Sequence, residues 1–406
     1  MHTLKLLHSI APAVLATCTL LGAACGPAKP TPVQSTASTG AATTATGEPI
    51  KVGFVWGVTG AAAEIVRPAS EATRAYFDDL NKHGGIHGRP VQMVEIDSKY
   101  QVPLAQEGYK KVTTEDRVPL VVLASTGDTE ALAAQINADH VAAITFSCDE
   151  KWAQPSRNPY VFTICTTYQD QMTTALKFIK ERGVPDARVA FSYPDIPFGQ
   201  APIGVGRDYA KNLGLALVDE QKVGAAEVDA QSQALNLKAS NPDYVLIQNV
   251  AGGASAMVRS GKQIGLNAQF LGLNYAFDEA VVKAIGTRAA EGYLGVGPNA
   301  FPGEDIGVLQ DMRERAPNLK DVGMRSIVGW TVASVIGDAL QRAESYDGPG
   351  VLKALEHTDM DVKGAIPGSR WTYSSTAHVP TRKSVFYQVR QGAIVRISDP
   401  IDPPTR

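Results

Sequence analysis

The chain has 406 residues, of which 44% are hydrophobic and 19% charged, and its formal net charge is −3. This length exceeds what one hydrophobic core usually organises, so two lobes are expected. The composition excludes a largely disordered chain, and the near-neutral charge provides no basic field for binding nucleic acid.

The first 24 residues have the pattern of a secretory signal peptide. Lys5 supplies a positive charge, and an apolar stretch from about residue 10 to residue 21 follows it and ends in small residues. The ending LLGAAC resembles the lipobox of bacterial lipoproteins, in which cleavage leaves a lipidated cysteine as the first mature residue, although Gly22 stands where leucine is most frequent. We therefore expect cleavage after Ala24 and lipidation of Cys25, with an ordinary cleaved signal as the alternative.

Residues 25–49 are a low-complexity segment made almost wholly of Pro, Thr, Ala, Ser and Gly. Such a segment buries too little apolar area to offset the entropy of ordering it, which predicts a flexible tether. A lipid and a tether ahead of a globular body place that body in the periplasm or at the outer cell surface, anchored to a membrane. After the N-terminus, no run reaches the roughly 18 to 20 apolar residues of a membrane span.

The cysteines are interpreted in the light of that compartment. If Cys18 leaves with the signal and Cys25 carries lipid, Cys148 and Cys165 remain as an even pair in an oxidising environment. A disulfide between them is compatible with this count, but the sequence alone does not bring their Cα atoms within bonding range. Two cysteines 17 residues apart without nearby histidines make a poor zinc site.

The region from residue 50 to residue 146 alternates apolar runs with amphipathic runs of helical spacing. Strands are predicted at Ile50–Trp56, Val91–Ile96, Leu120–Ser125 and Ala142–Phe146, and helices at Glu71–His83, Leu104–Glu115 and Asp128–Ala138.

The stretch NKHGGIHGRP, residues 81–90, connects the first predicted helix to the second strand. Gly84 can adopt the left-handed conformation that ends a helix, and Gly88 can turn the chain before Pro90. His83 and His87 then lie on opposite sides of a broken helix, which argues against a metal site. A phosphate loop is also disfavoured, because these glycines follow a helix instead of opening one.

A second alternating series runs from residue 169 to residue 273. Helices are predicted at Gln169–Arg182, Phe198–Leu213, Asp229–Ala239 and Ala254–Ile264, and strands at Arg188–Tyr193, Ala216–Asp219, Asp243–Asn249 and Gln269–Leu273. Strands that are apolar throughout and joined by amphipathic helices indicate parallel sheets covered on both faces. Two such series predict an α/β fold of two doubly wound, Rossmann-like lobes.

Beyond GYLGV, residues 292–296, the pattern changes. Met324–Glu344 reads as a long, largely buried helix, and the remaining strands, such as Ser384–Arg390, are short. These pieces are too few for a third core, so we expect them to complete the first two lobes. The chain then crosses between the lobes more than once.

Several motifs together resemble one protein family. LNKHGGIHGRPVQMVEID, from Leu80, looks like the N-terminal signature of type I periplasmic solute-binding proteins, the branched-chain amino-acid group of ABC importers. The match continues with NPYVF at Asn158, NPDYVLIQN at Asn241, AAEGYLGV at Ala289 and GW at Gly329. No single motif is unique to the family, but their order and spacing cover the chain from about residue 50 to residue 397.

The resemblance implies two lobes joined by a three-crossing hinge, with a small ligand in the cleft between them. Closure of the lobes on the ligand then presents both lobes to a membrane permease. We place the crossings near 165–168, 297–302 and 374–379. Lobe 1 is expected to comprise residues 50–166 and 298–376, and lobe 2 residues 167–297 and 377–406. Open α/β sheets also bind ligands at the carboxyl ends of their strands, which supports a cleft site independently.

Two segments that follow strands of lobe 1 are candidates for this site. Ser125, Thr126 and Gly127 open a helix, where hydroxyls and free backbone N–H groups suit a carboxylate, although ordinary N-capping by Thr126 or Asp128 is the alternative. Cys148 and Asp149, with Trp152 as a third candidate, lie where the family's amino-acid binders offer small and hydroxyl residues. A solvated surface turn is the alternative for this segment.

In lobe 2 the resemblance points to Phe198, which matches the aromatic residue that commonly covers the ligand. Asn274, followed by Tyr275, falls where the amino-acid binders usually carry an acid for the ligand's ammonium group. Burying an unpaired ammonium costs several kcal/mol, so this departure argues against an ordinary α-amino acid unless Asp149 substitutes.

Arg325 begins the long helix at a position that points into the cleft in the family. A guanidinium there could hold a carboxylate by two parallel hydrogen bonds, and a structural ion pair or a solvated helix end is the alternative. An arginine facing the cleft favours an organic or aromatic acid, or an amide, over leucine.

Other functions find less support in the sequence. We find no nucleophile elbow, metalloprotease motif or P-loop, and the seven histidines are scattered, so neither an enzyme nor a cofactor is expected. The serious alternative is a ligand-sensing receptor domain that acts through a separate signalling protein, because the same fold serves that role.

Overall fold

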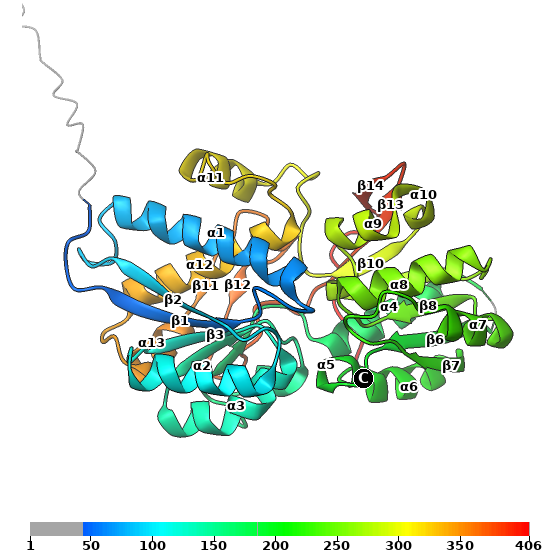
Figure 1. The fold of residues 1–406 in the computed structure, drawn as a ribbon, viewed down its shortest axis with the longest axis horizontal. Coiled ribbons are helices and arrows are strands. Elements are labelled where there is room, and N and C mark those ends of the chain that lie inside the picture. The colour runs from blue at the N-terminus through cyan, green and yellow to red at the C-terminus, as the bar shows by residue number, and fades with distance from the viewer. Residues whose placement is uncertain (1–43, 185, 406) are drawn as a thin grey trace, which may run out of the picture. The chain divides into compact units, whose positions relative to one another are not determined.

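The computed structural model describes residues 44–184 and 186–405. The predicted signal peptide, Cys18, Cys25 and the tether up to residue 43 lie outside the described residues. The described chain builds two open sheets with helices on their faces, and Figure 1 shows the elements in order along the chain.

The first sheet has five parallel strands in the order β2-β1-β3-β4-β5. These strands are β1 (Ile50–Trp56), β2 (Val91–Asp97), β3 (Leu120–Leu123), β4 (Ala142–Thr145) and β5 (Val161–Thr163). All residues of β3 and β4 are buried, as expected for strands covered on both faces.

Two pairs of helices cover this sheet. They are α1 (Ala63–Lys82) with α12 (Met324–Arg342), and α2 (Val102–Thr114) with α3 (Thr126–Asp139). In Figure 1 the first pair lies on one face of the sheet and the second pair on the other. Gly329 lets α12 approach α1 closely, because a Cβ there would clash with the Ala69 backbone, and the Gly329 carbonyl accepts from the Thr73 hydroxyl at 3.1 Å. Helices α11 (Gly307–Arg315) and α13 (Gly348–Leu355) and the short strands β11 (Asp359–Met360) and β12 (Trp371–Thr372) come from the C-terminal part of the chain.

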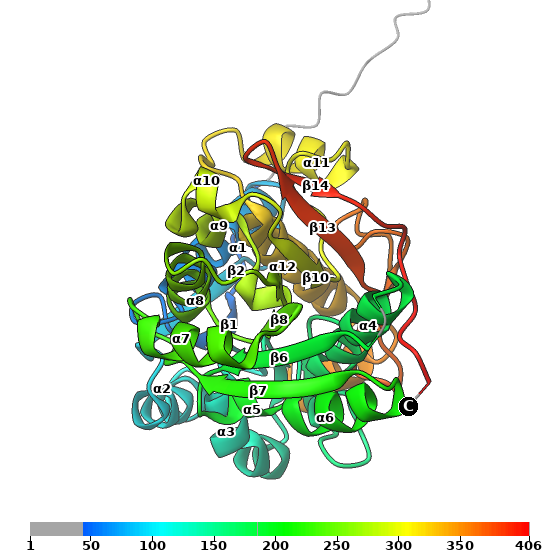
Figure 2. The ribbon, with the colours of Figure 1, turned by 90° about the vertical axis from the view of Figure 1, so that its right-hand side faces the viewer.

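The second sheet has seven strands in the order β14-β13-β10-β9-β8-β6-β7. They are β6 (Arg188–Tyr193), β7 (Ala216–Lys222), β8 (Tyr244–Ile247), β9 (Gln269–Gly272), β10 (Leu294–Gly297), β13 (Val385–Arg390) and β14 (Ala393–Arg396). The first five are parallel, and β13 and β14 add an antiparallel hairpin at one edge, which Figure 2 shows in red beside β10. The helices of this lobe are α4 (Tyr168–Glu181), α5 (Pro197–Gln200), α6 (Ile203–Asn212), α7 (Gln231–Ser240), α8 (Ala251–Gln263), α9 (Glu279–Ile285) and α10 (Thr287–Ala290).

The chain passes between the two sheets after β5, after β10 and before β13. The third passage lies later than the predicted 374–379. His378 still belongs to the first lobe, because its carbonyl accepts from the Thr163 amide at 3.0 Å and its ring stacks on Phe162 at 3.8 Å. His378 therefore packs with the first lobe, although residue 377 was predicted to begin the second.

The glycine-rich stretch at residues 81–90 forms the predicted helix end and turn. Helix α1 stops at Lys82, and Gly84, Gly85 and Gly88 have φ angles of 99°, 62° and 82°. The His83 ring bonds back to the Asp79 carbonyl at 2.9 Å. Within residues 44–184 and 186–405, no group of three His, Cys, Asp or Glu side chains could hold a metal ion.

Two helix predictions need correction, and proline is involved in both. The helix predicted from residue 198 to residue 213 is two helices, α5 and α6, because Pro202 lacks the N–H that would bond to the Phe198 carbonyl. That carbonyl accepts instead from the Gln248 side chain at 3.0 Å. Helix α1 begins at Ala63, eight residues before the predicted start at Glu71. Its first turns include Pro68, a residue type that is unusual inside a helix. None of the helices in the described part of the chain is long and apolar enough to cross a membrane.

Candidate functional site

The segment after β3 places two hydroxyls at the carboxyl edge of the first sheet. The Ser125 hydroxyl caps α3 by accepting from the Asp128 amide at 3.2 Å, so the capping residue is Ser125 and not Thr126 or Asp128. The Thr126 hydroxyl instead contacts the Ser147 hydroxyl at 2.8 Å, and Ser147 follows the neighbouring strand β4. The segments after β3 and β4 are therefore joined into one polar cluster.

A disulfide fixes the segment after β4 to the first passage between the lobes. Cys148 and Cys165 are joined, with Cα atoms 5.7 Å apart. Beside it, the Asp149 carboxylate accepts from the Gln169 side chain of α4 at 3.0 Å and pairs with Lys151 at 3.4 Å. Asp149 thus faces the second lobe, but its oxygens already have partners within the protein.

Three aromatic rings pack edge to face where the lobes meet. Tyr168 lies 5.5 Å from Phe198 and 6.2 Å from Tyr275, and the latter two are 6.1 Å apart. The Tyr275 hydroxyl donates to the Phe146 carbonyl at 2.5 Å, which links the second lobe to the end of β4. Both tyrosines are buried, and loss of solvation raises the pKa of each phenol well above its usual value.

The Tyr168 hydroxyl reaches the polar cluster of the first lobe. Hydrogen bonding from the Cys148 backbone, followed by the Thr126 and Ser147 hydroxyls, partly opposes the rise in the pKa of Tyr168. Two of these residues, Thr126 and Cys148, are ones that the sequence assigned to a ligand. In this structure they form hydrogen bonds with the Tyr168 hydroxyl and not with a ligand.

Arg325 at the start of α12 is paired across the lobes. Its Nε atom donates to the Asp278 carboxylate at 2.9 Å, and Nη2 donates to the Asn274 carbonyl at 2.8 Å. The guanidinium also lies over the Tyr275 ring, 4.8 Å from its centre. Of the readings that sequence analysis left open, this contact is the structural ion pair.

Asp278 is a site residue that sequence analysis missed. It lies four residues after Asn274, caps α9 by accepting from the Val281 amide at 2.9 Å, and is 1% exposed. The next residue, Glu279, accepts from the Met324 amide at 3.1 Å, and burial raises the pKa of Glu279. The only local signal was an Asp-Glu pair before a helical run, which also describes an ordinary helix start.

Asp128 is a second buried acid, which the sequence offered only as an N-capping residue. Its side chain lies in the first turn of α3, is 1% exposed, and neither carboxylate oxygen has a hydrogen-bond partner among the described residues. Burial raises the pKa of Asp128 to about 6, against a smaller opposite effect of the nearby Ser125 hydroxyl.

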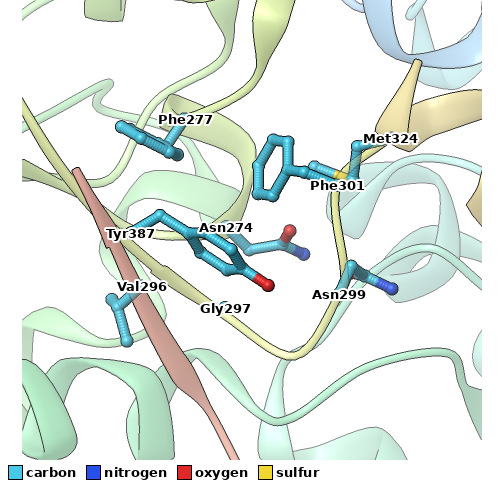
Figure 3. A pocket seen from close by; sticks show the side chains of 8 residues that line it. All are labelled: Asn274, Phe277, Val296, Gly297, Asn299, Phe301, Met324 and Tyr387. Atoms are coloured by element: carbon cyan, nitrogen blue, oxygen red, sulfur yellow. The ribbon is translucent and has the colours of Figure 1, made fainter. Parts of the chain in front are cut away.

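A small cavity lies beside Asn274, next to the second passage between the lobes. Figure 3 shows the rings of Phe277, Phe301 and Tyr387 around the Asn274 side chain. The cavity has a volume of about 10 Å³, which holds one water molecule at most. A solute of amino-acid size therefore does not fit in this cavity as the structure has it.

Comparison with known proteins decides the family. Residues 49–393 match the family described as periplasmic binding protein. The chain belongs to this family. This periplasmic binding protein is 23% identical over 307 residues to the leucine-, isoleucine-, valine-, threonine- and alanine-binding protein of Pseudomonas aeruginosa, covering 75% of this chain and 82% of the relative.

Solved structures confirm the predicted fold of this periplasmic binding protein. A branched-chain amino-acid ABC transporter protein from Thermus thermophilus with bound valine superposes with a TM-score of 0.80 at 21% identity, covering 87% of this chain and 97% of that one. A solute-binding protein from R. palustris in complex with benzoate gives 0.76 at 16% identity, covering 87% and 98%. The family is one of periplasmic binding proteins, and the relatives are described as binding or transport proteins, so the predicted class of function, an extracytoplasmic solute-binding protein and not an enzyme, is confirmed.

The binding protein brings most of the predicted site residues to one place. Thr126, Cys148, Phe198, Tyr275 and Arg325 are buried where the lobes meet or at the adjoining strand ends. Ser125 and Gly127 lie in the first turn of α3, Asp149 faces α4, and Asn274 begins the turn after β9. Trp152, the third candidate after β4, donates to the Ser147 hydroxyl at 3.0 Å.

Proposed function

We propose that this periplasmic binding protein captures a small solute between its lobes. The observation that carries the proposal is the convergence of strand-end side chains from both sheets on one buried cluster. Tyr275 reaches Phe146, Asp278 reaches Arg325, and Gln169 reaches Asp149, each across the lobes. Contacts of this kind break when the lobes separate and form again on closure, which is how a cleft admits and retains a ligand.

The proposed ligand is a small polar or amphipathic solute, in the range of an amino acid, an organic or aromatic acid, or an amide. The relatives named above bind branched-chain amino acids or benzoate, which supports this size class. The residues proposed to contact it are Ser125, Thr126, Gly127, Cys148, Asp149, Phe198, Asn274, Tyr275 and Arg325. Because several of these now bind one another, ligand entry must exchange contacts within the protein for contacts with the ligand.

Delivery to the transmembrane permease of an ABC importer is the proposed second step. The Thermus thermophilus relative is described as part of such a transporter, which supports the assignment. We also propose that the mature chain starts at Cys25 and is held to the membrane by a lipid on that residue. The lipobox-like ending and the low-complexity segment that follows it support this anchor.

A solute screen tests the binding function. The protein is heated with single amino acids, aromatic acids and amides, and a ligand at about 100 times its dissociation constant should add roughly 2.7 kcal/mol to the free energy of unfolding. Small-angle scattering with each stabilising solute should show a change in the radius of gyration. If no solute in a broad library stabilises the protein or changes its scattering, the proposed function is wrong.

Lipid labelling tests the anchor. In cells that express the full chain and are fed an alkyne-tagged fatty acid, the protein should carry the label and be recovered in the membrane fraction. The Cys25→Ala variant should lose the label, while Cys18→Ala should keep it. Label that persists in Cys25→Ala would show that the lipid site is elsewhere.

A further inference from the structure

The carboxylate of Asp128 is buried and has no counter-charge paired with it among the described residues. Among buried side-chain atoms that lack a hydrogen-bond partner in the described residues, the two oxygens of Asp128 are the only carboxylate atoms. A carboxylate removed from water without a partner is costly unless a counter-charge arrives or it takes up a proton. The first turn of a helix favours an acid, and the nearby Ser125 hydroxyl offsets part of the effect of burial, but neither supplies a counter-charge.

Aromatic residues of both lobes lie near the start of α3. Burial raises the pKa of Tyr100, and the nearby Tyr168 phenol and Asp128 carboxylate raise it further. The Tyr168 hydroxyl reaches Thr126, the first residue of α3, and the Tyr168 ring packs edge to face on Phe198 of α5. Helix α5 in turn packs against α3.

The groups that could receive an anion nearby are already engaged. Arg325 is neutralised by Asp278, and Lys151 pairs with both Asp149 and Glu130. The hydroxyls of Thr126 and Ser147 contact each other and the Tyr168 phenol. A ligand carboxylate would have to displace these partners, whereas a ligand cation would displace none at Asp128.

We propose that Asp128, with the rings of Tyr100, Tyr168 and Phe198, forms a subsite for a protonated amine on the ligand. The inference rests on the proposed function, since it names the chemical class of the captured solute. An ammonium group placed there supplies the missing counter-charge and donates hydrogen bonds to the carboxylate. The aromatic rings add cation–π attraction, which is strongest where water is excluded.

Titration calorimetry on the complete mature protein tests the inference with four probes. Benzylamine, benzyl alcohol and benzoate share one ring and carry a positive, zero and negative charge, and leucine adds an α-amino acid. Benzylamine should bind most tightly. Asp128→Asn should weaken benzylamine binding at least tenfold and leave benzyl alcohol unchanged, while Asp78→Asn, the same change at an exposed position of the same lobe, should alter neither.

The outcomes separate this inference from the function on which it rests. Binding of benzoate or leucine without benzylamine would overturn the amine subsite and leave the solute-binding function standing. Equal benzylamine affinity in Asp128→Asn and the parent protein would also overturn it, as would binding of none of the four probes. The function itself is then judged by the broad solute screen and scattering. Should Asp128→Asn fail to fold, Phe198→Leu serves instead and should weaken benzylamine more than benzyl alcohol.

Discussion

Asp278 and Asp128 are both 1% exposed, and their surroundings differ in a way that assigns them different roles. Asp278 accepts from the Arg325 guanidinium and from the Val281 amide, so its charge is balanced inside the protein. Neither oxygen of Asp128 has a partner in the described part of the chain. The paired acid can hold the lobes together, whereas the unpaired one lowers the stability of the fold unless something binds to it.

Removing the cation of the paired acid should have the largest effect. Arg325→Met leaves Asp278 buried without its counter-charge, and breaking a buried pair in this way typically costs about 3–5 kcal/mol. Urea unfolding monitored by tryptophan fluorescence gives the change in free energy. The double variant Arg325→Met with Asp278→Leu should recover most of the loss. A loss below about 1 kcal/mol in the single variant would show that the pair does not hold the lobes.

Neutralising the unpaired acid should act in the opposite direction. The pKa of Asp128 is raised by burial to about 6 from its ordinary value of 3.8, so the folded state binds the proton more tightly than the unfolded state. The proton therefore stabilises the fold below about pH 4, and this contribution is lost as the pH rises through 6. Asp128→Asn should gain up to about 3 kcal/mol at pH 7 and almost nothing at pH 4.

Urea unfolding of Asp128→Asn and of the parent protein at pH 7 and pH 4 measures this change in stability, and Asp78→Asn is the control variant. The Tyr100 and Tyr168 phenols near Asp128 stay protonated throughout this range, because burial raises the pKa of both. An Asp128→Asn protein that is less stable than the parent at pH 7 would mean that the carboxylate has partners when the protein is in solution.

The contact between Tyr275 and Phe146 should have a smaller effect. Tyr275→Phe keeps the ring and removes the hydroxyl, which leaves the buried Phe146 carbonyl without its donor, at a cost of about 1–3 kcal/mol. Because this bond joins the lobes, amide hydrogen exchange should rise on both sides of the cleft. Exchange confined to the second lobe would argue that the bond does not couple the two.

The smallest effect is expected at the start of α12. Glu279→Gln removes a negative charge that accepts from the Met324 amide, and such a helix-end interaction contributes about 0.3–1 kcal/mol. Glu107→Gln, at an exposed acid on α2, provides the control under the same urea assay. A loss equal to that of Arg325→Met would mean that Glu279, and not Asp278, is the main link to α12.

The sequence predicted the sheets well because their strands are continuous apolar runs, such as Leu120–Leu123 and Arg188–Tyr193. It also placed Thr126 and Cys148 correctly at strand ends, since parallel strands end at one edge of a sheet. It failed where position depends on contacts distant in the chain. His378 stays with the first lobe through β5, 217 residues away from its partner Val161, and local sequence carries no sign of that bond.

The same dependence on contacts distant in the chain explains why the surroundings of Asp278 and Asp128 were not predicted. Asp278 becomes the partner of Arg325 only because the turn after β9 in one lobe meets the start of α12 in the other, a separation of 47 residues. Asp128 was expected at most to cap its helix, and its burial depends on how the rest of the fold packs over α3, which the local sequence does not show. Pro202 shows a local signal that was available, since a proline inside a predicted helix breaks its hydrogen bonding.

A crystal structure of the protein with the most stabilising solute from the screen would show whether that solute is held between the two lobes. We expect density that contacts Asp128 or Thr126 from the first lobe and Phe198 or Tyr275 from the second. Density confined to the outer surface of one lobe would contradict this expectation.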